Sequence, residues 1–328
     1  NDEQLLLNLV RLRYLDSTAF VEVGSITAQS SFQSGIEGGR QAASVGNAAG
    51  FFGIMGSLNY STQPTMVYTP LQGEDFIRRL MAPLTLERLV LLYHSGWSLK
   101  RLFSLCIQEI NEIENAARSP HPRPERVAEI RKFARVVELL GDLDARDGVD
   151  LLAEPQSEGK ASQYVLHIAP DVVASPVAQE LAKLLGVEPG LSYYRLAYPF
   201  AEPGKSPSLD TIYVEPRSVL GIMQFLSRHV DVPKQDWESG RVDVESGVNQ
   251  IAESIGNDKP SGPRFVIKSQ SERPVQSAVA VRYRDSWFYI DDIDLKTKET
   301  FSLLTQLFAL QASAIQVTPP VLTLPVGR

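Results

Sequence analysis

Cysteine is almost absent from this chain of 328 residues, which contains only Cys106. A single cysteine excludes an intramolecular disulfide and a cysteine-rich metal site. Cys106 lies in the apolar stretch 102–107, whose helical spacing predicts a buried structural thiol rather than a nucleophile. The net charge is −7 and no block of basic residues occurs, which argues against nucleic acid as the main partner because phosphate binding needs clustered lysine and arginine.

Long apolar runs and catalytic motifs are missing as well. The longest apolar helical runs, such as Leu89–Tyr93, are far shorter than the roughly 20 residues that a membrane-spanning helix needs. The sequence contains no GxSxG, GxxxxGK[ST], GxGxxG or HExxH motif. Four scattered histidines, for which we expect structural roles, have no metal-ligand spacing: His94, His121, His167 and His229. We therefore predict a protein that is not an enzyme, with no catalytic residue and no cofactor.

Charge is missing between Glu22 and Glu37, and again between Arg40 and Glu74. Two runs in this region alternate with a period of two, which predicts a long amphipathic β-hairpin over residues 20–72 with a glycine-rich tip. The predicted polar face consists of Thr27, Gln29, Ser31, Gln33, Ser57, Asn59 and Ser61. The predicted apolar face consists of Ile26, Phe32, Ile36, Phe52, Ile54, Leu58 and Tyr60.

Such a hairpin has two interpretations. Each alternating run covers about 9–11 residues, the length of a strand that crosses a bilayer, and several copies could close into a ring without unpaired edges. Half-buried hairpins of soluble proteins also alternate, and Ala28, Ser30 and Gly56 dilute the apolar face. The absence of charge favours insertion, because exposed strands usually carry lysine or glutamate.

The whole chain is predicted to be an α+β protein in four parts. They are an N-terminal helix in residues 1–19, the hairpin in residues 20–72, a helical segment in residues 73–148 and a mixed α+β module in residues 149–328. In the helical segment we predict helices at Leu84–Tyr93, Leu99–Asn115 and Pro124–Leu140, the last one ending at Gly141.

In the C-terminal module, short β runs alternate with helices. Ser175 and Pro176 predict a helix start and Gly186 its end, while Asp285 marks a tight turn between two strands. The other helices are expected at Glu215–Val230 and Lys298–Ala312, and the run Val321–Val326 could add an edge strand.

An acidic cluster follows one of the predicted strands in this module. Alternating carboxylates such as Asp291, Asp292 and Asp294 could ligate a hard cation such as Ca²⁺, although the other ligands of a calcium loop are missing. Aspartate is also common in turns and at helix starts, and we favour that interpretation. We therefore expect no metal site, with these three residues as the weak candidates.

Several stretches carry a resemblance to a known family. They are Asp2–Tyr14, Pro64–Thr65, Tyr68–Leu71, Ser95–Trp97, Trp287–Asp292, Phe301–Leu310 and Pro320–Gly327. These stretches, spread over nearly the whole chain, resemble uncharacterised proteobacterial proteins that are predicted envelope lipoproteins. The resemblance implies a signal peptide and a lipidated cysteine upstream of Asn1. It implies no activity and no site residue.

These observations lead to one main hypothesis and two alternatives. The main hypothesis is a non-enzymatic lipoprotein of the bacterial outer membrane or periplasm that forms a homo-oligomeric ring, to which each copy contributes its hairpin as part of a β-barrel pore or collar. This architecture is analogous to that of curli-type secretion lipoproteins. The expected partners are further copies, other envelope proteins and outer-membrane lipid. The alternatives are a periplasmic adaptor or scaffold subunit and an envelope hydrolase.

Overall fold

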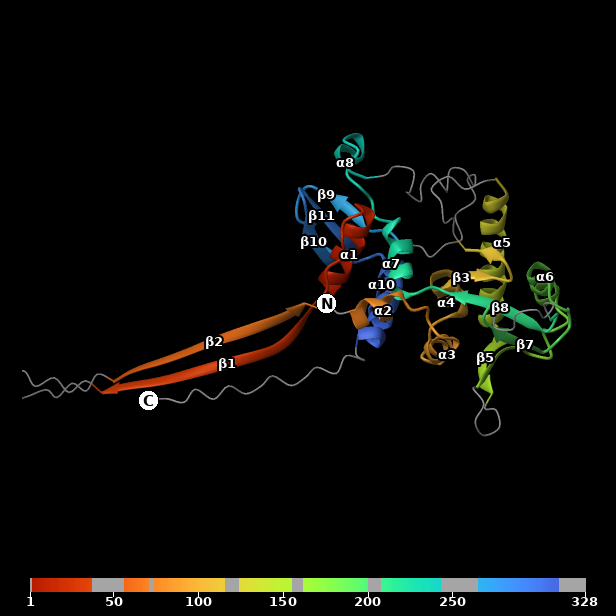
Figure 1. The fold of residues 1–328 in the computed structure, drawn as a ribbon, viewed down its shortest axis with the longest axis horizontal. Coiled ribbons are helices and arrows are strands. Elements are labelled where there is room, and N and C mark those ends of the chain that lie inside the picture. Colours follow the sequence, from red (N-terminus) through yellow and green to blue (C-terminus); the bar gives the residue numbers. More distant parts are fainter. Residues whose placement is uncertain are drawn as a thin grey trace, which may run out of the picture. The chain divides into compact units, whose positions relative to one another are not determined.

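The computed structural model describes residues 2–36, 56–70, 74–115, 124–154, 162–199, 208–242 and 265–312. The fold is α+β, as predicted (Figure 1). The chain forms two compact units: residues 19–72 with 316–328, and residues 1–18 with 73–315. We refer to the first as the hairpin unit and to the second as the body.

The hairpin unit contains two long antiparallel strands, β1 (Val21–Ile36) and β2 (Gly56–Pro70). They form because both runs alternate with a period of two and contain residues that suit a pleated surface. The register is continuous from the pair Ser25–Val67 to the pair Ile36–Gly56, and it shifts between Val23 and Ser25. The predicted hairpin is confirmed.

The N-terminal helix α1 (Asp2–Arg13) agrees with its prediction. Acidic residues occupy its first turn and basic residues its last, as the helix dipole favours. Its apolar stripe is buried and includes Leu5, Leu6 and Leu9, and the helix contacts α7 (Val219–Ser227) and β10 (Ser277–Tyr283). The first helix of the chain therefore packs against elements from its last third.

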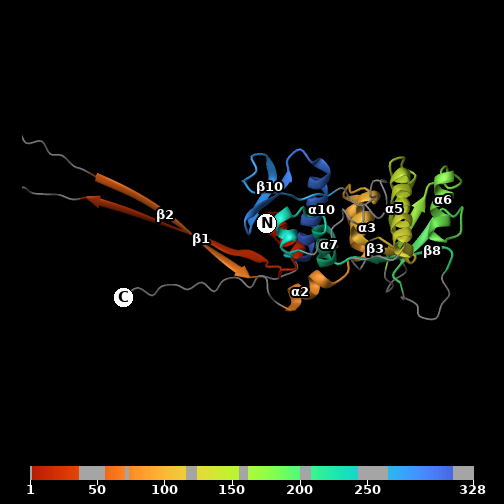
Figure 2. The ribbon, with the colours of Figure 1, turned by 90° about the horizontal axis from the view of Figure 1, so that it is seen from above.

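A six-stranded sheet forms one part of the body, in the order β4-β3-β8-β7-β6-β5. The strands are β3 (Ile107–Ile110), β4 (Ile113–Glu114), β5 (Val149–Glu154), β6 (Gln163–Ile168), β7 (Tyr193–Ala197) and β8 (Thr211–Pro216). Strands β7 and β8 are parallel, and the other neighbours are antiparallel. Helix α5 (Pro124–Asp144) contacts both outer strands, β4 and β5. It also packs against α6 (Pro176–Leu185), beside which it lies in Figure 2.

A three-stranded sheet forms a second part, in the order β10-β11-β9. Its other strands are β11 (Ser286–Asp291) and β9 (Lys268–Gln270), and the tight turn predicted at Asp285 joins β10 to β11. Helix α10 (Leu295–Ala312) follows and contacts α7 and α2 (Glu74–Met81), while the short helix α8 (Lys234–Glu238) comes after α7. Phe288 and Leu304 are fully buried in this part.

Several local predictions are confirmed by the caps of the helices. Ser175 caps α6 through its side chain, and Gly186 ends this helix with a φ of 69°, in the left-handed region that glycine tolerates. Ser98 caps α4 (Leu99–Cys106) in the same way as Ser175, and Thr85, for which no cap was predicted, caps α3 (Leu86–His94).

Other predictions are wrong. The helix predicted at Leu99–Asn115 ends at Cys106, because the next residues pair as β3 and β4 through a turn at Asn111. Two strands therefore interrupt the predicted helical segment, and β3 pairs with β8 across its expected boundary. Helix α5 continues through Gly141, where an added Cβ would lie 3.0 Å from the Cβ of Lys100. This glycine permits close packing with α4 instead of ending the helix.

Two differences concern the C-terminal module. Strand β5 was not predicted and is stabilised by its antiparallel pairing with β6. The helix expected from Glu215 starts only at Val219, because β8 continues to Pro216 and Ser218 caps the helix. The edge strand predicted at Val321–Val326 lies outside the described residues.

Candidate functional site

The hairpin is the first candidate site, and its register shows which positions face each other across the ladder. The predicted polar positions are opposed as Thr27–Thr65, Gln29–Gln63, Ser31–Ser61, Gln33–Asn59 and Gly35–Ser57. The predicted apolar positions are opposed as Ile26–Met66, Phe32–Tyr60, Ser34–Leu58 and Ile36–Gly56. Opposed residues of an antiparallel ladder share one face of the sheet. Phe52 and Ile54 lie outside the described residues.

The charge-free ladder is long. It extends from Val23 to Ile36 in β1, and a strand rises by about 3.3 Å per residue, so the ladder is about 45 Å long. A tilt of about 45° reduces its height to about 30 Å, which matches the hydrocarbon core of a bilayer. Among the described residues β1 and β2 pair only with each other, so each strand has one outer edge without a strand partner.

The acidic cluster is the second candidate, and its three carboxylates have separate partners. Asp291 Oδ2 accepts a 2.7 Å hydrogen bond from Lys268 Nζ, which lowers the pKa of this carboxyl group, and Asp292 Oδ1 lies 2.7 Å from Lys298 Nζ. Asp294 accepts hydrogen bonds from the backbone and hydroxyl of Thr297 in the first turn of α10. In the described part of the chain, no group of three His, Cys, Asp or Glu residues could hold a metal ion.

The three described histidines lie on or next to different elements, α3, β6 and α7. His94 is exposed at the end of α3, and the ring of His167 lies 4.6 Å from that of Tyr193. His229 Nδ1 is 3.3 Å from the carbonyl oxygen of Phe225, and burial lowers the pKa of His229 to about 4. His121 lies outside the described residues.

Cys106 is fully buried at the end of α4, as its apolar surroundings in the sequence predict. Burial raises the pKa of this thiol to about 12, so the thiolate needed for nucleophilic attack is scarce at neutral pH. The residue therefore serves as a small apolar side chain of the core.

A buried arginine beside Cys106 was not identified from the sequence. The Arg217 side chain donates to Gln108 Oε1 at 3.0 Å and to the carbonyl oxygen of Leu105 at 2.9 Å, and its guanidinium group lies 4.2 Å from the centroid of the Phe225 ring. Burial lowers the pKa of Arg217 to about 9. The contacts join α4 and β3 to α7, and Arg217 satisfies carbonyl groups at the C-terminus of α4.

The side chain of Asn115 contributes to the same end of α4. Its Nδ2 atom donates to the carbonyl oxygens of Ser104 at 2.8 Å and of Ile107 at 2.7 Å. Arg217 and Asn115 therefore replace the helical hydrogen bonds that are lost where the chain changes from helix to strand.

Besides the contacts of Arg217 and Asn115, a second polar network joins the end of α1 to the C-terminal elements. The Tyr14 hydroxyl donates to Asp236 Oδ2 at 2.6 Å, and Arg241 Nη1 lies 2.9 Å from the other oxygen of Asp236. Asp16 accepts hydrogen bonds from the Tyr283 hydroxyl and from Arg284 Nη2, which lies at 3.1 Å. The hydrogen bond from Tyr283 lowers the pKa of Asp16.

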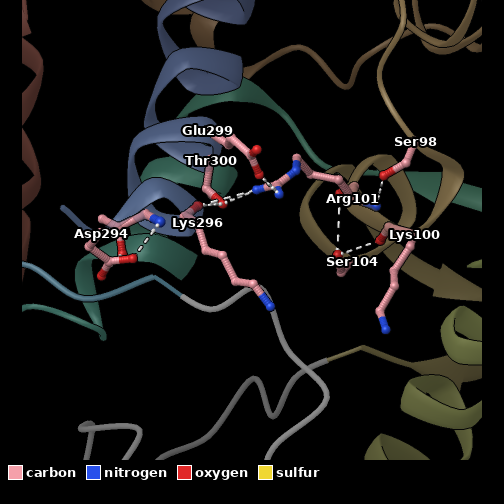
Figure 3. A network of polar contacts seen from close by, with 9 residues as sticks. Ser98, Lys100, Arg101, Ser104, Asp294, Lys296, Glu299 and Thr300 are labelled. Carbon is pink, nitrogen blue, oxygen red and sulfur yellow. Dashed lines mark hydrogen bonds and ion pairs between the residues drawn. The ribbon is translucent and has the colours of Figure 1, made fainter.

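A third network joins α4 to α10 (Figure 3). The Arg101 guanidinium group donates to Thr300 Oγ1 at 2.7 Å and to the carbonyl oxygen of Lys296 at 3.3 Å, and it forms an ion pair with Glu299. Trp97 Nε1 adds a 2.9 Å hydrogen bond to Gln306 Oε1 of the same helix. Arg101 and Trp97 thus connect α4 and the turn before it to α10.

Comparisons with protein-family models, with curated proteins and with solved structures find no match to this chain. The resemblance to predicted envelope lipoproteins therefore stays a prediction. Within the described ranges, no helix is long and apolar enough to cross a membrane.

The polar contacts of the body, in separate places, involve Tyr14, Asp16, Arg101, Arg217 and Asp236, and none of these residues was singled out in the sequence. Their partners lie up to 268 positions away, as for Asp16 and Arg284, so local spacing contains no signal for these contacts. The position of Arg217 directly before the capping residue Ser218 is the only local cue. The networks stabilise the body, and the hairpin is the candidate functional element.

Proposed function

We propose that this protein is a non-enzymatic subunit of a homo-oligomeric ring in the bacterial cell envelope, in which each copy contributes its β1–β2 hairpin to a shared barrel or collar. The observation that supports this function is the ladder of β1 and β2, which is free of charge over about 45 Å and has an unpartnered outer edge on each side.

An isolated two-stranded hairpin is marginally stable in water, and long edges without charge tend to pair with other strands. Closure of several hairpins into a ring satisfies the backbone groups of every edge, and in lipid a closed ring is required. Positions such as Thr27, Gln29 and Ser61 would then form an uncharged polar lining, which attracts water without selecting ions by charge.

A location at the outer membrane or in the periplasm, with lipid anchoring, belongs to the same proposal and rests on the resemblance. A mass measurement tests the assembly. Light scattering on the full-length protein, with and without detergent, is expected to show a multimer that is monodisperse only in detergent. A monomer under both conditions contradicts the ring, and a monodisperse ring without detergent contradicts membrane insertion but leaves a soluble collar.

The middle of the hairpin favours the second candidate function, a periplasmic adaptor or scaffold whose hairpin packs on a partner protein. The pairs Ala28–Pro64 and Ser30–Thr62 place small or polar residues at the centre of the predicted apolar face. A lipid-facing strand is usually most apolar at this level. Recovery of the full-length protein in a stoichiometric complex with a different envelope protein would favour this function over the ring.

The hydrolase alternative needs a catalytic group in the body. Its named candidates, Asp291 and Asp292, form ion pairs with Lys268 and Lys298. Alanine at both aspartates is expected to leave the fold and the cellular phenotype intact. Loss of a cellular phenotype in a variant that still folds would favour the hydrolase.

A further inference from the structure

One proline indicates which backbone N–H and C=O groups of the hairpin point toward its outer edges. Pro64 lies opposite Ala28, inside the continuous register from Ser25 to Ile36. Opposed residues of an antiparallel ladder either exchange two N–H···O bonds or direct these groups away from each other. Since proline has no N–H group, Ala28 and Pro64 form a pair of the second kind.

The alternation of the ladder extends this assignment along both strands. Within the continuous register, the backbone groups that point to the outer edges belong to the even-numbered positions: Ile26, Ala28, Ser30, Phe32, Ser34 and Ile36 in β1, and Gly56, Leu58, Tyr60, Thr62, Pro64 and Met66 in β2. Pro70, the other proline of β2, lies opposite Val21 beyond the register shift and is outside this alternation. The N–H and C=O groups of the odd-numbered positions form the hydrogen bonds between β1 and β2.

The same even-numbered positions form the predicted apolar face. We infer, on the basis of the proposed ring, that its copies join head to tail: the outer edge of β2 in one copy pairs antiparallel with the outer edge of β1 in a second copy of this chain. Hydrogen-bonded pairs across this junction connect even positions with even positions. Because opposed residues share a face, the apolar face continues from copy to copy and the polar face lines the other side.

Closure of the ring decides between the possible edge pairings. A β1–β1 or β2–β2 junction uses the same surface on both copies, which gives a closed pair with two outer edges still open. A ring in which every junction is the same therefore requires β2–β1, which repeats from copy to copy and leaves no edge. Both edges are uncharged over matching lengths, so no like charges oppose this junction.

Pro64 also sets a limit on the junction. Its missing N–H removes one donor from the outer edge of β2, so one hydrogen bond of the β2–β1 junction is absent. Natural sheets use proline at edges to weaken unwanted strand addition. We therefore expect the junction to be incomplete at this one level.

Disulfide cross-linking between full-length chains tests the junction. One set of chains carries a cysteine in β1 (Ala28→Cys, Ser30→Cys or Ser34→Cys), and the other set carries one in β2 (Leu58→Cys, Thr62→Cys or Met66→Cys). Several positions are needed because the stagger between copies determines which of them are opposed. Cys106 is buried and stays in place. The matched control pairs each β1 variant with Ser61→Cys or Gln63→Cys, which are odd positions of β2.

Mixed assemblies of these chains are oxidised and separated under non-reducing conditions. We expect cross-linked dimers in at least one even–even mixture and none in assemblies of a single variant or in the even–odd controls. Cross-links within a single variant, cross-links in the controls, or an intact multimer without any even–even cross-link would overturn the head-to-tail junction. Failure of the wild-type chain to form a multimer contradicts the ring itself, so the two failures are distinguishable.

Discussion

The hydroxyl group of Tyr14 donates a 2.6 Å hydrogen bond to Asp236 Oδ2, although 222 positions separate the two residues. The contact joins the first turn after α1 to the short helix α8. Burial and the neighbouring carboxylate both raise the pKa of the Tyr14 hydroxyl, so it stays protonated and acts as a donor over the whole physiological range.

Removal of this hydroxyl is expected to destabilise the body. Tyr14→Phe keeps the ring but leaves Asp236 with Arg241 as its only charge-assisted partner among the contacts described. We expect the free energy of unfolding to fall by about 1.5–3 kcal/mol, the range for a hydrogen bond to a charged group. Urea denaturation, monitored by tryptophan fluorescence, measures this free energy of unfolding.

The control for this prediction is Tyr193→Phe, since Tyr193 is 53% exposed. We expect a change within about 0.5 kcal/mol, as for most surface substitutions. Equal effects of the two variants would contradict a stabilising role of the Tyr14–Asp236 contact.

Substitution of Arg217 by lysine is expected to destabilise the body. Arg217→Lys retains a charge but loses the planar group that donates to Gln108 and Leu105 and stacks on Phe225. We expect a loss of about 2–3 kcal/mol in the free energy of unfolding, because carbonyl groups at the end of α4 then lack donors. The measurement is the same denaturation experiment.

Arg195→Lys provides the matched control for Arg217→Lys. Arg195 is exposed and its ion pair with Asp210 spans 3.4 Å, so a change within about 0.5 kcal/mol is expected. A loss of the same size in both variants would show that the burial of Arg217 has no special effect.

Acid is expected to destabilise the body through His229. Burial lowers the pKa of His229 to about 4, whereas the unfolded value is 6.5. Between these values the unfolded chain binds a proton that the folded chain does not, so stability is fully present above pH 6.5 and is lost as pH falls toward 4. Between pH 7 and pH 5 the loss is about 2 kcal/mol.

Substitution by glutamine isolates this contribution from that of the carboxyl groups. In His229→Gln the free energy of unfolding is expected to depend less steeply on pH between 7 and 5 than in the wild type. His94→Gln, at an exposed position, is expected to keep the wild-type slope. The prediction fails if His229→Gln and the wild type have the same slope.

A charge on the predicted apolar face is expected to prevent assembly. Phe32 lies opposite Tyr60, and Phe32→Asp places one carboxylate per copy on the face that would contact lipid or a neighbouring layer. We expect a penalty of about 2 kcal/mol per copy and a loss of both multimer and membrane recovery. Light scattering in detergent and membrane fractionation measure the outcome.

Gln33→Asp is the control for Phe32→Asp, because it adds the same charge to the adjacent position on the opposite face. This variant is expected to assemble, since the proposed polar lining would be in contact with water. Unchanged assembly of Phe32→Asp, or loss of assembly in Gln33→Asp alone, contradicts the assignment of the two faces.

Local sequence signals predicted the elements whose determinants are adjacent in the chain. Ser175 and Gly186 delimit α6 because a cap needs only its own side chain or its own φ angle. The same reasoning failed at Gly141, which fits closely against Lys100 of a neighbouring helix, and beyond Cys106, where pairing with β8 replaces helical hydrogen bonds. In both places a distant segment outweighs the local preference.

The sequence by itself determined the hairpin, because alternation with a period of two and the absence of charge depend only on neighbouring residues. It also contained Pro64, but the meaning of this proline for the edge required the register that places it opposite Ala28. Only the tertiary structure decided the burial of Arg217 and the pairing of Tyr14 with Asp236. These contacts join segments that are far apart in the chain, and their formation depends on the packing of the whole body.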